Sequence, residues 1–254
     1  MYFSRKVPEN LNNMRIDSIL KELNFVDSRN KAAAIVMAGK VFVNDNKVVK
    51  PGKIIKSDTI IKIKRNEHAW VSRGGIKLNK ALKVFDVNVS DKICLDVGCS
   101  TGGFTDVLLK YEARKVYAVD VGYGQFDWKL RNSEKVILLE RTNARNLCKK
   151  IISESIDIVV CDVSFISIKK VLLPVKQLVN EKYEIISMIK PQFEASKELV
   201  GRGGIVKDEK VHNNICREIK LWLTKNFQYK IIKIIESPIL GQKGNKEFLI
   251  YLRN

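Results

Sequence analysis

The sequence lacks the features that would place the protein in a membrane or outside the cell. No apolar run approaches the roughly 20 residues needed to span a bilayer. The first stretch, residues 1–13, carries Arg5 and Lys6 but lacks the apolar segment that a secretory signal needs behind such charges. We therefore expect a cytoplasmic protein with no membrane partner.

Cysteine and histidine are scarce and do not cluster. The five cysteines are an odd number, no two form a C-x-x-C pair, and neither His68 nor His212 lies beside one of them. A disulfide framework or a zinc site would need paired spacings of this kind. We expect free thiols, most of them buried, and no metal.

Acidic residues are too few to balance the basic ones. The chain has 46 Lys and Arg against 28 Asp and Glu, a formal net charge of +18. Such a charge favours a polyanionic partner, nucleic acid first and an anionic membrane surface second. A proteome that is basic throughout would give the same total. The excess is densest near the start, since residues 1–66 hold fourteen basic and six acidic residues.

The amino-terminal quarter has the pattern of a small α+β domain. We expect a helix from Arg15 to Leu23, a second helix between the cap Ser28 and Gly39, a hairpin over 41–49, and a strand over 59–64. The segments that carry a resemblance here are Arg15-Ile16-Asp17, Ser28-Arg29-Asn30-Lys31-Ala32, Ala38-Gly39-Lys40-Val41 and Val43-Asn44. They resemble the S4-like RNA-binding domain.

The S4 resemblance implies a set of RNA contacts. In that family the helices and the hairpin present basic side chains to the RNA backbone, which implies Arg15, Arg29, Lys31 and Lys40 here. The alternative is that these residues are solvated charges on two amphipathic helices.

The rest of the chain alternates strands with helices, which predicts an α/β domain with a mostly parallel sheet covered on both faces. The length of 254 residues suits two domains of unequal size. We expect an S4-like domain over 1–64, a linker over 65–72 and a Rossmann-like domain over 73–254. Seven strands are expected, near 92–97, 115–120, 136–140, 156–161, 184–189, 229–236 and 247–252.

A glycine-rich turn after the first of these strands predicts a nucleotide-type cofactor site. Asp96-Val97-Gly98 leads through Ser100 to Gly102-Gly103-Phe104 and a helix, so the backbone and the helix terminus could approach a ligand. The spacing fits neither the G-x-G-x-x-G fingerprint nor a phosphate loop. It resembles the turn of S-adenosylmethionine-dependent methyltransferases.

Two polar residues after the next strands support this site. Asp120 ends the second strand, where an acid can bind ribose hydroxyls, and Asn143 follows the third strand and suits the adenine edge. The expected cofactor residues are Asp96, Gly98, Ser100, Gly102, Gly103, Phe104, Asp120 and Asn143.

Charged residues also end later strands of the sheet. Asp162 and Lys190 follow two apolar strands, and the carboxyl ends of neighbouring parallel strands share one crevice. Further segments carry a closer resemblance: Trp70 to Leu78, Leu95 to Asp106, Val119 to Gln125, Leu139 to Arg145, Cys161 to Ser167 and Ile189 to Glu194. Over nearly the whole chain, the sequence resembles the TlyA family.

The resemblance to the TlyA family implies a specific reaction. That family joins an S4-like domain to an FtsJ-like methyltransferase domain and 2′-O-methylates cytidine in ribosomal RNA, in the large subunit alone or in both. Its catalytic Lys, Asp, Lys and Glu match Lys77, Asp162, Lys190 and Glu247. His68 departs from the family, because relatives often have a permanently charged residue near that position.

These residue types suit methyl transfer without a metal. The enzyme must align a ribose hydroxyl with an electrophilic methyl group and remove the hydroxyl proton. Lys190 is the candidate base, Lys77 would attract the developing alkoxide, and Asp162 and Glu247 would orient the two amines. A structural ion pair between Asp162 and Lys190 is the simpler alternative.

Two other functions remain possible from the sequence. Members of this family are also called haemolysins, which would imply a membrane-acting protein, and a non-catalytic RNA-binding assembly factor could retain the same fold. We expect a monomer that acts on ribosomal RNA or ribosomal subunits. The glycine-rich loop 201–204 is either an element that closes over substrate or a flexible connector.

Overall fold

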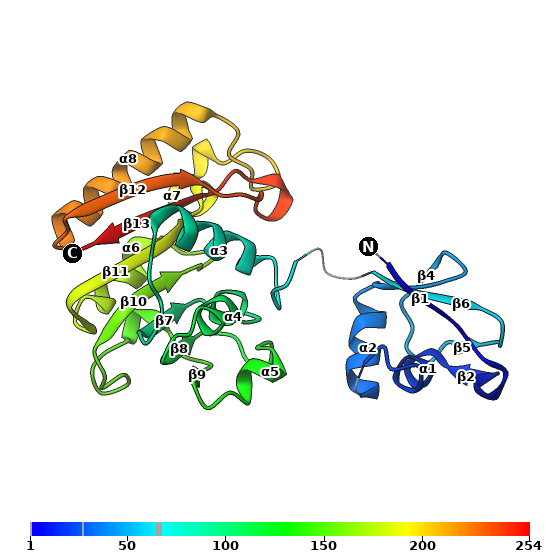
Figure 1. Ribbon diagram of the computed structural model, residues 1–254. Coiled ribbons are helices and arrows are strands. Elements are labelled where there is room, and N and C mark those ends of the chain that lie inside the picture. Colours follow the sequence, from blue (N-terminus) through cyan, green and yellow to red (C-terminus); the bar gives the residue numbers. More distant parts are fainter. Residues whose placement is uncertain (1, 27, 65–67) are drawn as a thin grey trace. The chain divides into compact units, whose positions relative to one another are not determined.

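The computed structural model describes residues 2–26, 28–64 and 68–254. The chain divides into two compact units, an N-terminal unit over Met1–Ala69 and a C-terminal unit over Trp70–Asn254 (Figure 1). Of the expected linker over 65–72, residues 65–67 lie outside the described residues.

The N-terminal unit contains the predicted helices and hairpin. Its elements are β1 (Tyr2–Lys6), η1 (Glu9–Leu11), β2 (Met14–Arg15), α1 (Ile16–Glu22), α2 (Arg29–Met37), β3 (Val41–Val43), β4 (Asn46–Val48), β5 (Ile54–Ile55) and β6 (Ile60–Lys64). The Ser28 hydroxyl accepts the backbone N–H of Lys31 and so caps α2 as predicted. Asn44 and Asp45 both adopt positive φ, the conformation that a tight hairpin turn requires.

The strand β1 was not predicted from the sequence. It pairs antiparallel with β6 at the edge of a four-stranded sheet of order β1-β6-β3-β4. All five of its residues are exposed, so it has no buried apolar face to produce an alternating pattern. Its partner strand lies more than fifty residues away, which local reading of the sequence cannot detect.

The C-terminal unit is an α/β domain with a seven-stranded, mostly parallel sheet, as predicted. Its strands are β7 (Ile93–Val97), β8 (Lys115–Val119), β9 (Val136–Leu139), β10 (Ile156–Cys161), β11 (Val179–Ile189), β12 (Ile231–Glu236) and β13 (Phe248–Arg253). The order is β12-β13-β11-β10-β7-β8-β9, and β13 runs antiparallel to the other six strands. β11 begins earlier than expected. Its first four residues are half-buried or exposed and three of them are polar, so the apolar pattern of the sequence did not reveal this part of the strand.

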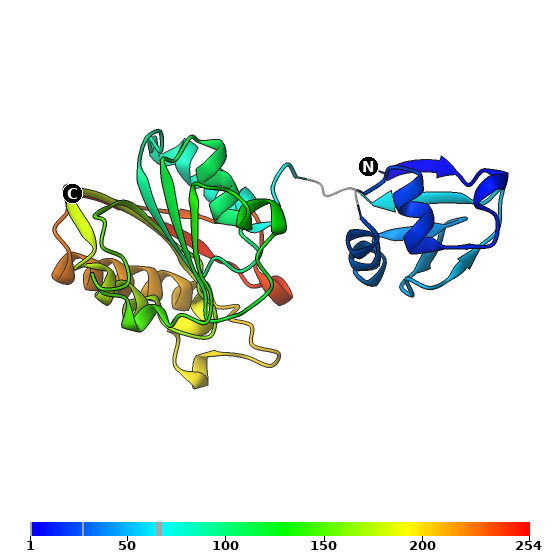
Figure 2. The same ribbon diagram turned by 90° about the horizontal axis from the view of Figure 1, so that it is seen from below.

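Alternating side chains along each central strand build a core on both faces of the sheet. Leu95, Val159 and Ile185 pack on one face against α6 (Ile168–Val175) and α8 (Glu209–Asn226). Cys94, Val160 and Ile186 pack on the other face against α3 (Gly74–Phe85) and α4 (Gly103–Lys110). Figure 2 shows the sheet between these two helical layers. The shorter helices are α5 (Trp128–Arg131), η2 (Ala144–Asn146), α7 (Pro191–Glu194), η3 (Lys197–Leu199) and η4 (Gln242–Gly244).

The strand order reverses beside β7, and this reversal positions the functional site. β7, β8 and β9 run outward in one direction, and the chain then returns to place β10 on the other side of β7. Ligands of open α/β sheets bind at such a switch point, outside the carboxyl ends of the strands. Gly98 follows β7 there, and Asp162 follows β10.

The segment before α3 is docked on the C-terminal unit. The Trp70 ring packs against the core that α3 and α4 share, and the Lys110 ammonium lies 4.5 Å from the centre of that ring. The Val71 N–H donates to Asp106 at 2.9 Å. The compact unit therefore begins with Trp70, inside the segment that we expected to be a linker.

Candidate active site

Two cavities of about 480 Å³ each lie at the carboxyl ends of the parallel strands. Lys77, Lys190 and Glu247 line the first, and Asp120 and Asn143 line the second. Five residues line both cavities: Gly98, Ser100, Asp162, Ser164 and Phe165. All four predicted catalytic residues and most of the predicted cofactor residues thus line two adjoining spaces.

The turn after β7 needs glycine at its first position. Gly98 has φ +84°, and a Cβ atom there would lie 3.1 Å from the backbone oxygen of Asp162. The N–H groups of Gly98 and Cys99 donate to the Val119 carbonyl at 2.9 and 3.1 Å. The turn is therefore fixed between β8 on one side and the end of β10 on the other.

Gly102 and Gly103 serve packing more directly than ligand approach. A Cβ atom on Gly102, which has φ +93°, would lie 2.4 Å from a methyl carbon of Leu130. A Cβ atom on Gly103 would lie 2.1 Å from the Ser72 hydroxyl. Gly103 and Phe104 line the first cavity, whereas Gly102 lines neither. These glycines let the start of α4 pack closely against α5 and the segment before α3.

Asp120 joins the turns that follow β7 and β8. One carboxylate oxygen accepts the N–H of Ser100 at 2.8 Å, and the other accepts the N–H of Gly122 at 2.7 Å. Asn143 lies across the second cavity, and its side-chain oxygen accepts the N–H of Arg145 at 3.0 Å. Both side chains are held in place and line the cavity at the same time.

Asp96 is completely buried beneath the turn and lines neither cavity. One of its oxygens accepts a hydrogen bond of 2.7 Å from the Thr105 hydroxyl in the first turn of α4. The other oxygen has no hydrogen-bond partner among the described residues. Burial raises the pKa of Asp96 to about 7, against the opposing effect of the Thr105 hydrogen bond.

This raised pKa predicts a pH-dependent stability of the C-terminal unit. The folded state holds the Asp96 proton more tightly than the unfolded chain, so stability falls as pH rises from about 4 through about 7. From about pH 5 to about pH 8, the wild type should lose about 2–3 kcal/mol more stability than Asp96→Asn.

Denaturant unfolding followed by tryptophan fluorescence measures this difference. All three tryptophans, Trp70, Trp128 and Trp222, lie in the C-terminal unit, so the signal reports that unit alone. Subtraction of the Asp96→Asn curve cancels the contribution of every other titrating group, because the two proteins share those groups. Parallel pH curves for the two proteins would show that Asp96 ionises without a burial penalty.

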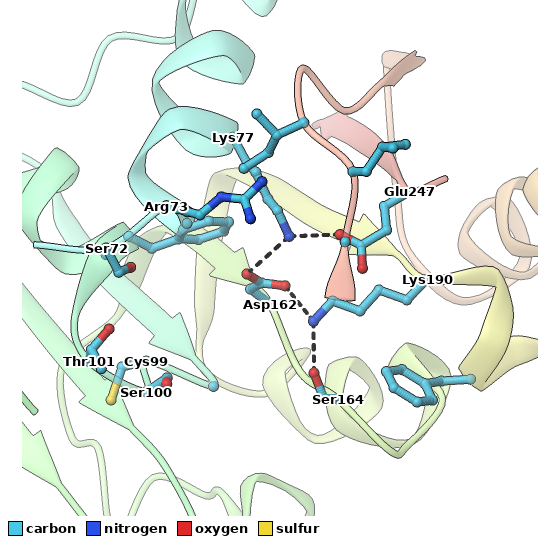
Figure 3. A pocket seen from close by; sticks show the side chains of 18 of the residues that line it. Ser72, Arg73, Lys77, Cys99, Ser100, Thr101, Asp162, Ser164, Lys190 and Glu247 are labelled. Atoms are coloured by element: carbon cyan, nitrogen blue, oxygen red, sulfur yellow. Dashed lines mark hydrogen bonds and ion pairs between the residues drawn. The ribbon is translucent and has the colours of Figure 1, made fainter. Parts of the chain in front are cut away.

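The structure brings Lys77, Asp162, Lys190 and Glu247 together in one alternating chain of charges. The Lys190 ammonium lies 2.7 Å from Asp162 Oδ1, and Lys77 lies 3.9 Å from Asp162 Oδ2. Lys77 also donates to Glu247 Oε2 at 2.7 Å. Figure 3 shows the Asp162 carboxylate between the two lysine side chains.

Four separate elements position these side chains. Lys77 lies in the first turn of α3, Asp162 follows β10, and Lys190 follows β11. Glu247 precedes β13, whose antiparallel direction puts its first residues at the edge where the parallel strands end. The pairing of Ile189 with Phe248 then aligns Lys190 with Glu247. Lys77, Lys190 and Glu247 are buried and Asp162 is half-buried, so water screens their charges less than at a surface.

Among the cavity residues that were not predicted from the sequence, three stand out by their contacts or conformation. The Ser164 hydroxyl lies 2.9 Å from Lys190 Nζ, and Gln192 donates to Glu247 at 3.4 Å. Phe165 is 86% exposed and adopts φ +64°, and its ring lies 5.0 Å from that of Phe193. A bulky residue held in this strained, exposed conformation is often functional. In the sequence, only the position of Phe165 shortly after Asp162 could have suggested a functional role for it.

The glycine-rich loop contacts Asn245, two residues before Glu247. The buried side chain of Asn245 donates to the Gly204 carbonyl at 2.9 Å and accepts the N–H of Val206 at 3.1 Å. Residues 201–204 line neither of the two cavities. The loop is therefore anchored at its base, and its closure over a substrate stays a prediction.

Two of the predicted RNA contacts meet in the N-terminal unit. Arg15 donates to both oxygens of the buried Asp17, at 3.1 and 2.7 Å, and Arg29 reaches the same carboxylate at 3.5 Å. The hydrogen bond from Arg15 is the main reason that the pKa of Asp17 is lowered to about 2. Lys31 lies in the first turn of α2, and Lys40 directly precedes β3.

Comparison with known proteins identifies both units. Residues 70–254 match the FtsJ-like methyltransferase family, and residues 14–61 match the S4 domain. The 16S/23S rRNA (cytidine-2'-O)-methyltransferase TlyA of Mycobacterium tuberculosis is 40% identical over 94% of this chain and 89% of that protein. Hemolysin A of Brachyspira hyodysenteriae is 42% identical over 94% of this chain and 99% of that protein.

A solved structure agrees with these sequence matches. A protein described as a hemolysin, from Streptococcus thermophilus, superposes with a TM-score of 0.71 and 37% identity, over 96% of this chain and 89% of that chain. No helix within residues 2–26, 28–64 and 68–254 is both long enough and apolar enough to cross a membrane.

Proposed function

Because the chain belongs to the TlyA family, with an S4 domain and an FtsJ-like methyltransferase domain, we propose a specific reaction for it. The protein transfers a methyl group from S-adenosylmethionine to the ribose 2′-hydroxyl of a cytidine in ribosomal RNA. Because ribosomal RNA is the proposed substrate, we propose that the protein is cytoplasmic.

One observation carries the proposal. Two lysines and two carboxylates form a continuous chain of contacts at the switch point of the sheet, where the two cavities adjoin. A non-catalytic RNA-binding factor would have no use for several ionised groups kept out of water, because burying charges costs free energy. The arrangement therefore favours the enzyme over a binding factor.

The second cavity fits the nucleoside part of S-adenosylmethionine. The Asp120 carboxylate lines this cavity and can accept from ribose hydroxyls, while Asn143 offers an amide to a base edge. When bound, the cofactor supplies an electrophilic methyl group on sulfur.

The first cavity supplies the groups that handle the proton. We propose that the Lys190 ammonium first releases a proton to solvent and that the resulting neutral amine then accepts the proton of the ribose hydroxyl. Asp162 and Ser164 hold its nitrogen from two directions, at 2.7 and 2.9 Å, and so fix where its lone pair points. Lys77 stays paired with Glu247 and stabilises negative charge that develops on the ribose oxygen.

Phe165 provides a surface for the target nucleotide. Its exposed ring lines both cavities and rests against Phe193. A ring in this place can stack on a base that has been turned out of its helix, which brings the attached ribose toward Lys190. In the N-terminal unit, Arg15, Arg29, Lys31 and Lys40 are the proposed contacts to the RNA backbone.

Mapping of alkali-resistant linkages tests the proposed function. A 2′-O-methyl group removes the internal nucleophile, so the modified linkage survives alkaline hydrolysis. Ribosomal RNA from cells with the protein should contain a resistant linkage after at least one cytidine that is absent from cells without it. Identical cleavage patterns from the two RNAs would refute the proposal.

We expect Asp120→Asn to weaken S-adenosylmethionine binding about tenfold or more, since a ribose would lose a charged acceptor. Isothermal titration calorimetry measures the effect. Asp127→Asn is the matched control, because Asp127 caps α5 and lines neither cavity. A cofactor analogue without ribose hydroxyls should bind both proteins alike. Wild-type affinity of Asp120→Asn would remove the proposed ribose contact.

Removal of residues 1–64 should separate RNA binding from cofactor binding. RNA affinity should fall, and the slope of log affinity against log salt should decrease by about 0.7–0.9 for each lost phosphate contact. Cofactor affinity should survive, because every proposed cofactor contact lies in the C-terminal unit with its own core. An unchanged salt slope would show that the C-terminal unit binds the RNA by itself.

A further inference from the structure

The four-stranded sheet of the N-terminal unit has one face that the core does not cover. Val41, Val43, Val48 and Ile61 point inward and are buried with α1 and α2. The alternation of the strands turns the intervening residues to the opposite side. We call this side the outer sheet face, and its residues are Tyr2, Ser4 and Lys6 of β1, Ile60, Lys62 and Lys64 of β6, Phe42 of β3 and Lys47 of β4.

Two aromatic rings meet across the middle of the outer sheet face. Tyr2 pairs with Lys64 and Phe42 pairs with Lys62, so the two aromatic residues lie on strands that flank β6. Their ring centres are 5.6 Å apart and the rings are nearly perpendicular. Tyr2 is 51% exposed. A ring left this accessible beside a second ring is a surface on which a planar group can stack.

Lysines share the outer sheet face with the aromatic pair. The strand positions of this face carry Lys6, Lys47, Lys62 and Lys64, and no acidic residue. Asp58 pairs with Lys6 at 2.9 Å and Asp45 with Lys62 at 2.7 Å, and both acids are exposed and lie in turns. Exposed ion pairs of this kind are weak, so a phosphate could take the place of either carboxylate.

From this juxtaposition we propose that the outer sheet face binds a single-stranded RNA segment. Bases stack on Tyr2 and Phe42, and the lysines contact the phosphates, which is the combination that single-strand binding surfaces use. The positive charge of the outer sheet face complements RNA and would repel a basic partner. This face is separate from the backbone contacts proposed for Arg15 and Arg29, because those residues lie on β2 and α2.

The strand β1 supplies part of this face from outside the matched S4 domain. The match to the S4 domain begins at residue 14, so β1 lies outside the matched part. Without β1, the sheet would lose Tyr2 and Lys6, and β6 would become an exposed edge. The added strand thus completes the aromatic pair.

Binding of a single-stranded RNA oligonucleotide of about ten nucleotides to the full chain tests the proposal. Measured by fluorescence anisotropy, Tyr2→Ala should weaken binding about 5- to 30-fold with an unchanged salt slope, because it removes stacking and no charge. Tyr2→Phe should bind as the wild type does. Lys62→Gln should lower the salt slope by about 0.7.

Met37→Ala is the matched control, since Met37 is 63% exposed at the end of α2, away from the sheet. Wild-type affinity of Tyr2→Ala, or an equal loss in Met37→Ala, would overturn the proposal. So would an equal loss by Tyr2→Ala on a duplex of the same sequence, because paired bases cannot stack on the rings.

Photo-crosslinking of the unmodified chain gives a second measurement that does not depend on a variant folding. Crosslinked nucleotides should map to Tyr2 or Phe42 by mass spectrometry, and crosslinks confined to α1, α2 or the C-terminal unit would contradict the proposal. Neither experiment needs a cofactor or methyl transfer. Their failure would therefore leave the proposed reaction intact.

Discussion

Lys190→Ala should lower single-turnover methyl transfer by at least about 10²-fold while cofactor affinity stays near wild type. The reason is that Lys190 lines the first cavity, where the ribose hydroxyl must lie, whereas the proposed nucleoside contacts line the second. Saturating amounts of enzyme and cofactor, with labelled methyl transfer to ribosomal RNA, give the rate directly. Calorimetry gives the affinity.

Lys190→Arg distinguishes a base from a fixed positive charge. Arginine keeps the charge and the ion pair with Asp162 but does not lose its proton in proteins. We expect this variant to be as inactive as Lys190→Ala. Substantial activity of Lys190→Arg would mean that the residue acts by charge alone and that another group removes the proton.

Glu247→Ala should destabilise the C-terminal unit by about 3 kcal/mol, near the low end for breaking a buried ion pair. Glu247 is 3% exposed, and its removal leaves Lys77 with Asp162 alone, at 3.9 Å. The cost stays at the low end because Lys77 lines the first cavity and water can reach it. Denaturant unfolding followed by tryptophan fluorescence measures the loss.

A double variant separates stability from activity at the same pair. Lys77→Met combined with Glu247→Leu removes both charges and fills their volume, so most of the lost stability should return. Methyl transfer should remain absent, because the charge that stabilises the ribose oxygen is gone. A single Glu247→Ala variant as stable as wild type would show that the pair is solvated and contributes nothing to the fold.

The sequence predicts the C-terminal sheet well because its strands are unusually apolar. Segments such as Ile156–Cys161 are buried on both faces, and this environment demands continuous Val, Ile and Leu. The meeting of Asp162 and Lys190 could be predicted for the same reason, since both follow such strands. Glu247 depended on the resemblance, because an antiparallel direction for β13 cannot be deduced from its sequence.

The sequence could not predict features that depend on long-range contacts. β1 has no buried face, and its partner is distant in the chain. The sequence pattern suggested that Gly102 and Gly103 let the backbone approach a ligand. In the structure, Leu130 and Ser72 restrict the space at these positions. Ser164 and Phe165 are singled out only by their positions in the cavities, because a serine and a phenylalanine in a loop carry no distinctive sequence pattern.

The proposed methyl-transfer site and the proposed RNA-binding surfaces lie in separate compact units. The ion-pair chain and both cavities belong to the C-terminal unit, whereas the proposed backbone contacts and the outer sheet face belong to the N-terminal unit. Changes in the N-terminal unit should therefore alter RNA affinity, and changes at Lys190 or Asp162 should alter the rate of transfer.

Identification of the methylated nucleoside tests the central claim most directly. Purified protein is incubated with isotopically labelled S-adenosylmethionine and with ribosomal RNA from cells that lack the protein, and the RNA is digested to nucleosides for mass spectrometry. We predict that the label appears in 2′-O-methylcytidine with the wild type and is absent with Lys190→Ala. Label on a base, or in a nucleoside other than cytidine, would contradict the account.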